Sequence, residues 1–261
     1  MNKKEQVKEK STWYIDNRNQ RKYEQKLPNE FLPESVQEGY AIQKLLISSM
    51  KDVVAWKLGG GTKSTREIFN TSDIYYGPIF KGHLFRSGSN IPLEILGSPK
   101  GEAEISFRLS EHISDITKYK EDPWKLVDAI APSIELPASV VEDVPKYGLP
   151  VLLADGCAYG ALVIGDHLDI NDRIKNKINT LELSFSSEEK LIKGNASNIL
   201  TTPIGAIYDF IKLAIENGEN IRAGQWVATG GCTPCVKLPI NHLIKADFGE
   251  LGNFSFRVIE K

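Results

Sequence analysis

The longest uninterrupted alternation of apolar and polar side chains runs from residue 101 to residue 109. The apolar set is Ala103, Ile105, Phe107 and Leu109, and the polar set is Glu102, Glu104, Ser106 and Arg108. Since successive side chains of an extended chain point to opposite faces, the pattern predicts a β-strand with one apolar and one polar face. Glu102 and Glu104 then share a face, about 7 Å apart along the strand.

A third carboxylate lies in the apolar segment from Pro132 to Pro137, where Glu135 is the one charged residue. Two carboxylates on a strand and a third in such a segment are typical of an oxygen site for a hard divalent cation. A strand with one charged face is also typical of a half-solvated antiparallel strand, so the spacing leaves both interpretations open. Glu135 favours the metal site, because an acid among apolar residues needs a partner.

Another charged residue in apolar surroundings is Lys57, which lies within the predicted buried strand 53–58. Its ammonium either reaches past the edge of the strand to water or faces a functional site. The glycine-rich segment 59–65 follows, but Thr62 stands where a Walker phosphate loop requires its second glycine. A Rossmann fingerprint is also absent from the sequence, so a nucleotide-binding loop is disfavoured.

The remaining pattern predicts a mixture of helices and strands. We expect a frayed tail and a polar surface helix within 1–30, and helices within 33–50, 118–130 and 201–218. We expect strands within 91–96, 221–231 and 248–258, on both sides of Asp155 in 151–165, and on both sides of a turn at 184–190 in 170–195. Residues 73–90 should form a loop, and the closing segment should pair into the main sheet.

Composition disfavours several classes of partner. The chain has 261 residues, of which 41% are hydrophobic and 25% are charged, with a net charge of −2. A charge this small gives no long-range field for nucleic acid or an anionic membrane. No segment approaches the ~20 apolar residues of a membrane helix, and the first ten residues lack the apolar segment of a secretory signal. We therefore expect a soluble, cytoplasmic protein with no nucleic-acid or membrane partner.

The cysteines and histidines form no recognisable catalytic motif. Cys232 and Cys235 make a C-x-x-C pair, but a zinc site requires a second ligand pair and the third cysteine is Cys157. Metal or redox use of the pair is therefore disfavoured, and small buried or loop residues are the default interpretation. The four histidines are scattered, with no nearby nucleophile that would form a triad.

Taken in order, these segments resemble the 2-oxopent-4-enoate hydratase/4-oxalocrotonate decarboxylase family, within the wider group of fumarylacetoacetate hydrolase-like enzymes. The matching segments are 38–43, 56–59, 76–77, 101–107, 132–135, 154–155, 224–230 and 251–252. No single motif is unique to the family, but their order and spacing together are specific.

The resemblance implies an α+β fold: a mixed, rolled β-sheet core with an N-terminal helical lobe. We expect a mostly helical lobe with a polar tail over 1–75 and a mixed β-roll catalytic domain over 76–261. The resemblance also implies homo-oligomers, and Mg²⁺ or Mn²⁺ held by Glu102, Glu104 and Glu135. The implied activity is that of a lyase, a hydratase or a decarboxylase of an unsaturated 2-oxo acid.

The same resemblance implies roles for further residues. Lys57, Leu58, Thr229 and Gly230 would contact the substrate. Such a 2-oxo acid chelates the cation, which stabilises the enolate formed when a proton or CO₂ leaves. Lys57 would move a proton or bind the substrate carboxylate, and Asp155 would orient Lys57 or a water.

This sequence departs from the family pattern at three polar positions. Residues 78–83 lack the acids common in the family, 155–158 lack an amide and a hydroxyl, and 229–231 contain Thr-Gly-Gly in place of Ser-Gly-Ser. His83 is a candidate to replace a lost proton-transfer group, the alternative being a satisfied surface histidine. Two other functions therefore stay open. One is a C–C bond hydrolase of an acylpyruvate, although no His–Glu pair for activating water is evident, and the other is a catalytically silent binding or scaffold homologue.

Overall fold

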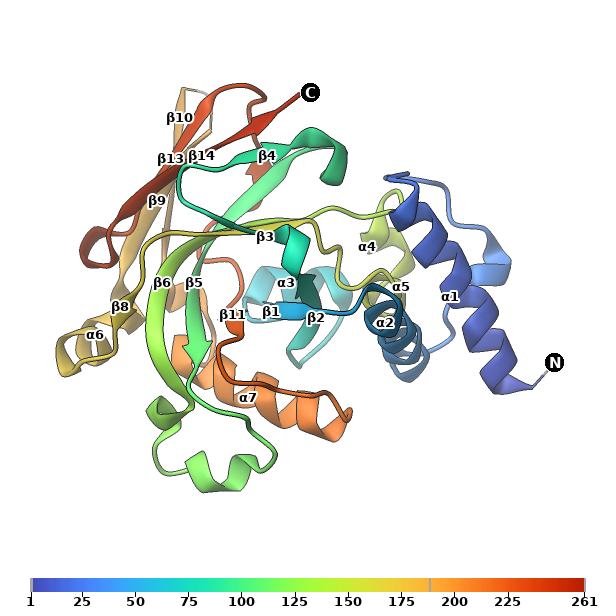
Figure 1. Ribbon diagram of the computed structural model, residues 1–261, viewed down its shortest axis with the longest axis horizontal. Coiled ribbons are helices and arrows are strands. Elements are labelled where there is room, and N and C mark those ends of the chain that lie inside the picture. The colour runs from blue at the N-terminus through green and yellow to red at the C-terminus, as the bar shows by residue number, and fades with distance from the viewer. Residues whose placement is uncertain (1, 188, 261) are drawn as a thin grey trace.

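Two β-sheets form the centre of the computed structural model, which describes residues 2–187 and 189–260 (Figure 1). The larger sheet has nine strands, in the order β2-β1-β11-β5-β6-β7-β3, with β12 paired to β5 and β8 paired to β6. The smaller sheet has five strands, in the order β10-β9-β13-β14-β4. The long strands β5 and β6 curve strongly, and helices α1, α2, α4 and α5 gather on one side (Figure 1). The predicted α+β class with a curled sheet and N-terminal helices is confirmed.

The elements have the following bounds. The larger sheet contains β1 Val53–Gly59, β2 Tyr75–Phe80, β3 Leu84–Arg86, β5 Lys100–Leu109, β6 Val127–Leu136, β7 Ala161–Ile164, β8 Leu168–Asp169, β11 Trp226–Ala228 and β12 Val236–Lys237. The smaller sheet contains β4 Asn90–Pro92, β9 Glu182–Ser187, β10 Lys190–Asn195, β13 Leu243–Asp247 and β14 Asn253–Ile259. The helices are α1 Lys3–Asn19, α2 Val36–Met50, α3 Lys63–Phe69, α4 Val144–Tyr147, α5 Leu149–Ala154, α6 Asp172–Lys177 and α7 Pro203–Glu216.

The middle of strand β5 is buried on both faces. Its apolar face contributes Ala103, Ile105 and Phe107 to the main core, all fully buried. The opposite face is fully buried at Glu104 and Ser106, with Glu102 and Arg108 partly buried on either side of them. The interpretation of β5 as a half-solvated strand is therefore wrong.

The helices complete two apolar cores. Helix α7 packs its apolar side on the large sheet, where Phe210 meets the rings of Trp56 and Tyr76. Helices α1, α2 and α5 share a second core that contains Tyr14, Ile42 and the apolar residues of α5. No helix within the described residues is long and apolar enough to cross a membrane.

Several predicted elements are wrong in type. Residues 118–130 contain only two 3₁₀ turns, Ile116–Tyr119 and Pro123–Leu126, before β6 begins. The long pairing of β6 with β5 overrides the local helical pattern. The apolar segment before Asp155 is helix α5 rather than a strand, an ambiguity inherent in short apolar segments.

Other differences concern the ends of the chain and its loops. Helix α1 begins at Lys3 with an Asn2 capping box, so the expected frayed tail is absent from the described residues. Residues 73–90 contain β2 and β3, and 170–195 contain α6 before the β9–β10 hairpin. That hairpin was predicted; residue 188, which falls between its two strands in the sequence, lies outside the described residues.

The closing strand β14 pairs with β13 and β4 in the smaller sheet, not in the main sheet. Strand β1 belongs to the large sheet, where it pairs with β2 and β11, although it precedes residue 76. The division of the chain into domains at that residue stays a prediction.

Candidate metal centre

The pairing of β5 with β6 brings three glutamates together. Glu102 stands directly opposite Glu135 in the antiparallel register, and Glu104 follows Glu102 on the same face of β5. One carboxylate oxygen from each residue lies within 4.8 Å of the other two. Among the described residues, this is the one group of acids, histidines or cysteines arranged closely enough to share an ion.

Lys57 supplies the positive charge beside this cluster. Its Nζ lies 2.5 Å from Glu135 Oε1 and donates to the Cys157 carbonyl at 2.7 Å. Lys57 lies on β1. The short strand β11, which ends at Ala228, separates β1 from β5 in the sheet. Burial disfavours the charge on Lys57, but the neighbouring Glu135 carboxylate holds its pKa above the ordinary value.

The remaining carboxylates are electrostatically strained. Burial, and then the charge of Glu135, raises the pKa of Glu102 to about 8. The same two causes raise the pKa of Glu104 well above its ordinary range. Three acids this close repel one another when ionised, and the single ammonium of Lys57 does not balance them.

The donor set fits a hard divalent cation. Glu104 Oε2 accepts the Gly230 N–H at 3.0 Å, but its buried Oε1 has no hydrogen-bond partner among the described residues. An oxygen of this kind costs free energy unless something binds it. Carboxylate oxygens are the ligands that Mg²⁺ and Mn²⁺ prefer, and a divalent charge would remove the repulsion. Gly231 leaves room for Glu102, since a Cβ at this position would lie 2.0 Å from Glu102 Oε2 and would displace the carboxylate.

A cavity of about 440 Å³ opens beside the cluster. Lys57, Glu102 and Glu135 line it together with the backbone of Gly230 and Gly231. Its other walls include the apolar residues Ile68, Phe69, Leu96, Val144 and Leu152, and one further cation, Lys100. This volume lies in the range that accommodates small organic ligands.

The chain is similar to known proteins over most of its length. No family model matches the chain. It is 25% identical over 228 residues to a 4-oxalocrotonate decarboxylase from a Pseudomonas species, covering 85% of this chain and 86% of the relative. It is 24% identical over 234 residues to a 2-keto-4-pentenoate hydratase from Paraburkholderia xenovorans (strain LB400), covering 87% and 85%.

A solved structure of 4-oxalocrotonate decarboxylase from Pseudomonas putida G7, complexed with magnesium and adipate, superposes with a TM-score of 0.87. The identity is 21%, and the match covers 99% of each chain. The chain is a homologue of these decarboxylases and hydratases. More distantly, a fumarylpyruvate hydrolase from Pseudomonas aeruginosa, in complex with Mn²⁺ and pyruvate, superposes with a TM-score of 0.60 at 11% identity, covering 79% of this chain and 89% of that one. The family resemblance predicted from the motifs is confirmed.

In this homologue, the structure brings some of the predicted site residues together. Lys57, Leu58 and Gly230 line the same cavity as Glu102 and Glu135. Thr229 does not line it: the residue is fully buried and its hydroxyl donates to the Ile105 carbonyl at 3.0 Å. Thr229 therefore supports the strand next to the three glutamates, and its contact with substrate stays a prediction.

Two predicted catalytic residues lie outside the lining of the cavity. Asp155 is fully buried and pairs with Arg18 at 2.9 Å, whereas Lys57 is held by Glu135 and Cys157. His83 packs its ring against Tyr159 and contacts the Gly160 carbonyl, and burial lowers its pKa. The geometry therefore favours neither residue as a group that contacts substrate.

Sequence reasoning missed two contributors to the site: the Cys157 carbonyl, which accepts a hydrogen bond from Lys57, and Lys100, which lines the cavity. A backbone carbonyl leaves no signal in a sequence. Lys100 continues the Glu102–Glu104 alternation by one step, so the pattern itself contained that signal. Cys235 lines the cavity as an exposed thiol while Cys232 is buried, and all three cysteines are free.

Proposed function

We propose that the chain is a divalent-metal-dependent lyase that acts on an unsaturated 2-oxo acid, as a hydratase or a decarboxylase. The observation that carries this proposal is the cluster of Glu102, Glu104 and Glu135 beside Lys57 at one cavity. The homologues support it, because they are named as enzymes of these two kinds. One neighbouring structure is a complex with Mn²⁺ and pyruvate, which is itself a 2-oxo acid.

The three glutamates would hold the ion, and we propose Mg²⁺ or Mn²⁺. When bound, such an ion neutralises the negative charge that develops as a 2-oxo acid becomes an enolate. The carboxylates have the fixed positions this requires, because paired strands hold Glu102 and Glu135 opposite each other. Little reorganisation is then needed during the reaction.

Lys57 would orient the substrate or transfer a proton to or from it. An ammonium has three N–H donors, and Glu135 and Cys157 account for two of them. The third is available to a ligand in the cavity, either to bind its carboxylate or to exchange a proton with it. Lys57 is buried, so water competes weakly for this contact.

The cavity suits a short chain with an apolar middle. Away from the three glutamates, the cavity walls include Phe69, Leu96 and Val144. Lys100 lies two residues before Glu102, on the same face of β5. A second carboxylate at the far end of a substrate would find its countercharge at Lys100.

The lyase reaction is favoured over C–C hydrolysis and over a silent scaffold. Hydrolysis requires a base that activates water. His83 is the one histidine predicted as a catalytic residue, and its contacts with Gly160 and Tyr159 keep it away from the cavity lining. A silent homologue would have no need to retain three mutually repelling acids.

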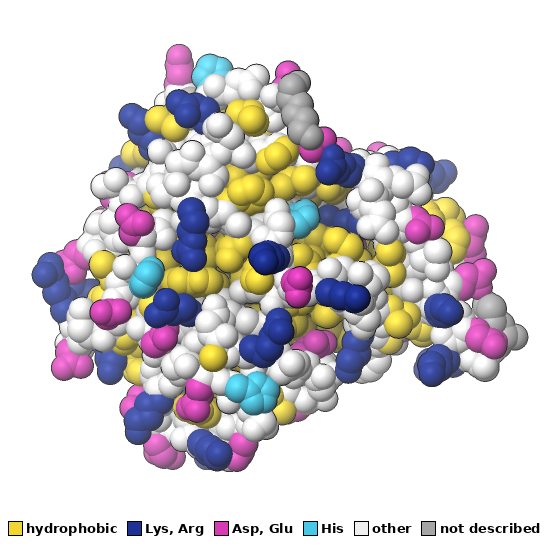
Figure 2. Space-filling model, viewed as in Figure 1, with side chains coloured by type: hydrophobic (Ala, Val, Ile, Leu, Met, Phe, Trp, Pro, Cys, Tyr) yellow, Lys and Arg dark blue, Asp and Glu magenta, His cyan; other side chains and the backbone are white. Residues whose placement is uncertain are grey.

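We also propose a cytoplasmic homo-oligomer. Hydrophobic side chains gather in the middle of the face in Figure 2, among charges of both signs, and such an area suits contact between copies.

The deciding experiment follows the absorbance of 2-oxo-3-enoate and 2-hydroxydienoate substrates with metal-stripped protein, before and after addition of Mg²⁺ or Mn²⁺. Turnover that appears with metal is the expected result, and Glu104→Gln should abolish it. Glu216→Gln, on the exposed side of α7, is the matched control and should leave turnover unchanged. Metal binding without turnover of any such substrate would favour the scaffold instead, and release of pyruvate from acylpyruvates would favour the hydrolase.

A further inference from the structure

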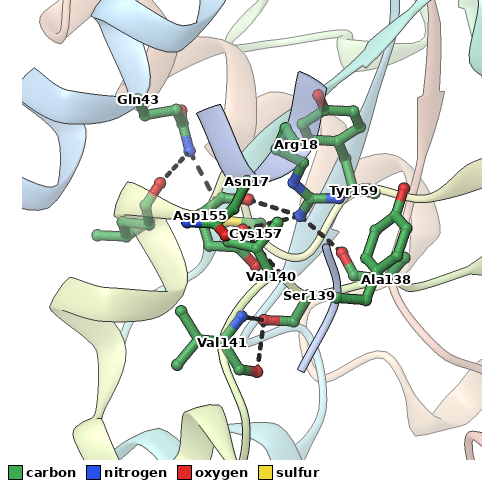
Figure 3. A network of polar contacts seen from close by, with 12 residues as sticks. Asn17, Arg18, Gln43, Ala138, Ser139, Val140, Val141, Asp155, Cys157 and Tyr159 are labelled. Carbon is green, nitrogen blue, oxygen red and sulfur yellow. Dashed lines mark hydrogen bonds and ion pairs between the residues drawn. The ribbon is translucent and has the colours of Figure 1, made fainter. Parts of the chain in front are cut away.

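Arg18 is a buried cation that the lyase chemistry does not use. It comes from the last turn of α1, is 6% exposed, and reaches into the body of the protein (Figure 3). Its Nη1 donates to the Tyr159 carbonyl at 2.6 Å. Its Nη2 donates to the carbonyls of Ala138 at 2.6 Å and Asp155 at 3.1 Å, and to Asp155 Oδ1 at 2.9 Å.

The acceptors of Arg18 belong to two loops that form a wall of the cavity. We call residues 137–141 the first wall loop and 155–159 the second. The loops contact each other directly, because the Ala138 N–H donates to the Ala158 carbonyl at 2.7 Å. Ala138, Ser139 and Ala158 line the cavity, so one guanidinium holds both loops from behind.

The second wall loop has an unfavourable backbone. Gly156, Cys157 and Ala158 have φ values of 66°, 57° and 55°, in the left-handed region. A residue with a Cβ adopts that conformation only where its surroundings enforce it. The Cys157 carbonyl in the middle of this left-handed turn is the group that accepts the Lys57 ammonium at 2.7 Å.

We propose that Arg18 is a positioning residue. Its hydrogen bonds to both wall loops hold the Cys157 carbonyl in place, and this carbonyl in turn holds the ammonium of Lys57 beside the three glutamates. The inference rests on the proposed lyase function for its catalytic readout. The N-terminal helix thereby becomes part of the active site without contacting substrate. Asp155 orients Lys57 indirectly, through the same turn.

Stability alone is a weak reason for this arrangement. A buried ion pair loses hydration on both partners and is often no better than an apolar pair of the same volume. Here the guanidinium is incompletely satisfied, since Arg18 Nε has no hydrogen-bond partner among the described residues. What the planar fork provides is geometry: several acceptors from two loops are fixed at once.

The test compares Arg18→Lys and Arg18→Met with Arg21→Met. Arg21 lies just beyond α1 and makes an exposed ion pair with Glu94 at 2.5 Å, so it is a matched control. Lysine keeps the charge but lacks the fork, so this variant addresses geometry even if the methionine variant does not fold. Three quantities are measured well below the Tm of each variant: Mn²⁺ affinity by calorimetry, kcat and KM, and hydrogen–deuterium exchange of the two wall loops.

We expect both Arg18 variants to lose about 100-fold in kcat, the scale of a displaced catalytic group, with KM and Mn²⁺ affinity close to wild type. Exchange in 137–141 and 155–159 should increase, while exchange in the β9–β10 hairpin should not. Arg21→Met should match the wild type throughout. Wild-type kcat in folded Arg18→Lys or Arg18→Met would overturn the proposal, even with a lowered Tm.

The proposed function can fail separately. If the wild type turns over no 2-oxo acid, the lyase proposal falls. Hydrogen–deuterium exchange alone then tests whether Arg18 holds the two wall loops in place. Unchanged exchange in the wall loops of Arg18→Lys would overturn the positioning role of Arg18.

Discussion

Replacing Glu104 by glutamine should have opposite effects on the protein with and without a divalent metal. Glu104 is fully buried beside Glu102 and Glu135, and burial together with these charges raises its pKa well above the ordinary 4.5. The metal-free native state therefore either protonates this carboxyl or bears its repulsion. Glutamine removes that cost, and its amide oxygen still accepts the Gly230 N–H.

The size of each effect follows from the site. At pH 7, protonating a carboxyl whose ordinary pKa is 4.5 costs about 3 kcal/mol, which is the upper limit of this strain. We expect a gain of about 1–3 kcal/mol in the metal-free free energy of unfolding, which raises Tm by about 2–4 °C per kcal/mol for a chain of this size. In wild type, metal at a hundred times its Kd should add about 2.7 kcal/mol. Glu104→Gln should lose most of that second gain.

Thermal unfolding in EDTA and in excess Mn²⁺ measures both quantities, with Glu216→Gln as the matched control. The expected result is a higher Tm in EDTA and a much smaller shift with metal. A Glu104→Gln protein that gains as many degrees from Mn²⁺ as wild type would refute the ligand assignment. A lower Tm in EDTA would show that the three acids do not strain the metal-free protein.

The other predictions concern further variants and the pH dependence of stability, measured by turnover, Mn²⁺ binding and thermal unfolding. Lys57→Met should lower kcat at least about tenfold while Mn²⁺ binds no more weakly, because a cation beside the site is lost; a fall in Tm alone, with kcat retained, would make Lys57 structural. Lys100→Met should raise KM about tenfold for a 2-oxo-enedioate but not for 2-oxopent-4-enoate, and equal changes for both would exclude a charge-specific contact. Gly231→Ala should weaken Mn²⁺ binding by displacing the Glu102 carboxylate, and unchanged affinity would show that the backbone yields instead. Without metal, the free energy of unfolding should fall as pH rises from about 4.5 to about 8, since the native state holds the Glu102 proton over that window and the unfolded state does not; a flat Tm in EDTA would contradict this.

The three glutamates of the proposed metal site could be singled out from the sequence because their signals are local. The alternation around Glu102 and Glu104 fixes which side chains share a face, and that face is independent of the rest of the fold. An acid such as Glu135 within an apolar segment indicates a partner whatever the topology. Helix α7 was predictable for a similar reason, since Thr202 caps it and Pro203 opens its first turn.

The failures arise where distant contacts override a local pattern. Residues from 127 onward form a strand because they pair with β5 along most of its length, which no window of sequence reveals. The apolar segment of α5 is a helix because it packs on α2 in the second core. Its length and composition fit either element.

By itself, then, the sequence determined the acidic face of β5, the unusual positions of Glu135 and Lys57, and the family to which these motifs are similar. Only the tertiary structure decided that Glu135 stands opposite Glu102, that Lys57 pairs with Glu135, and that Asp155 pairs with Arg18. The physical reason is that side-chain periodicity is a property of each element alone. The partner of a buried charge depends instead on how elements far apart in the chain pack together, as for Arg18 and Asp155, which are 137 residues apart.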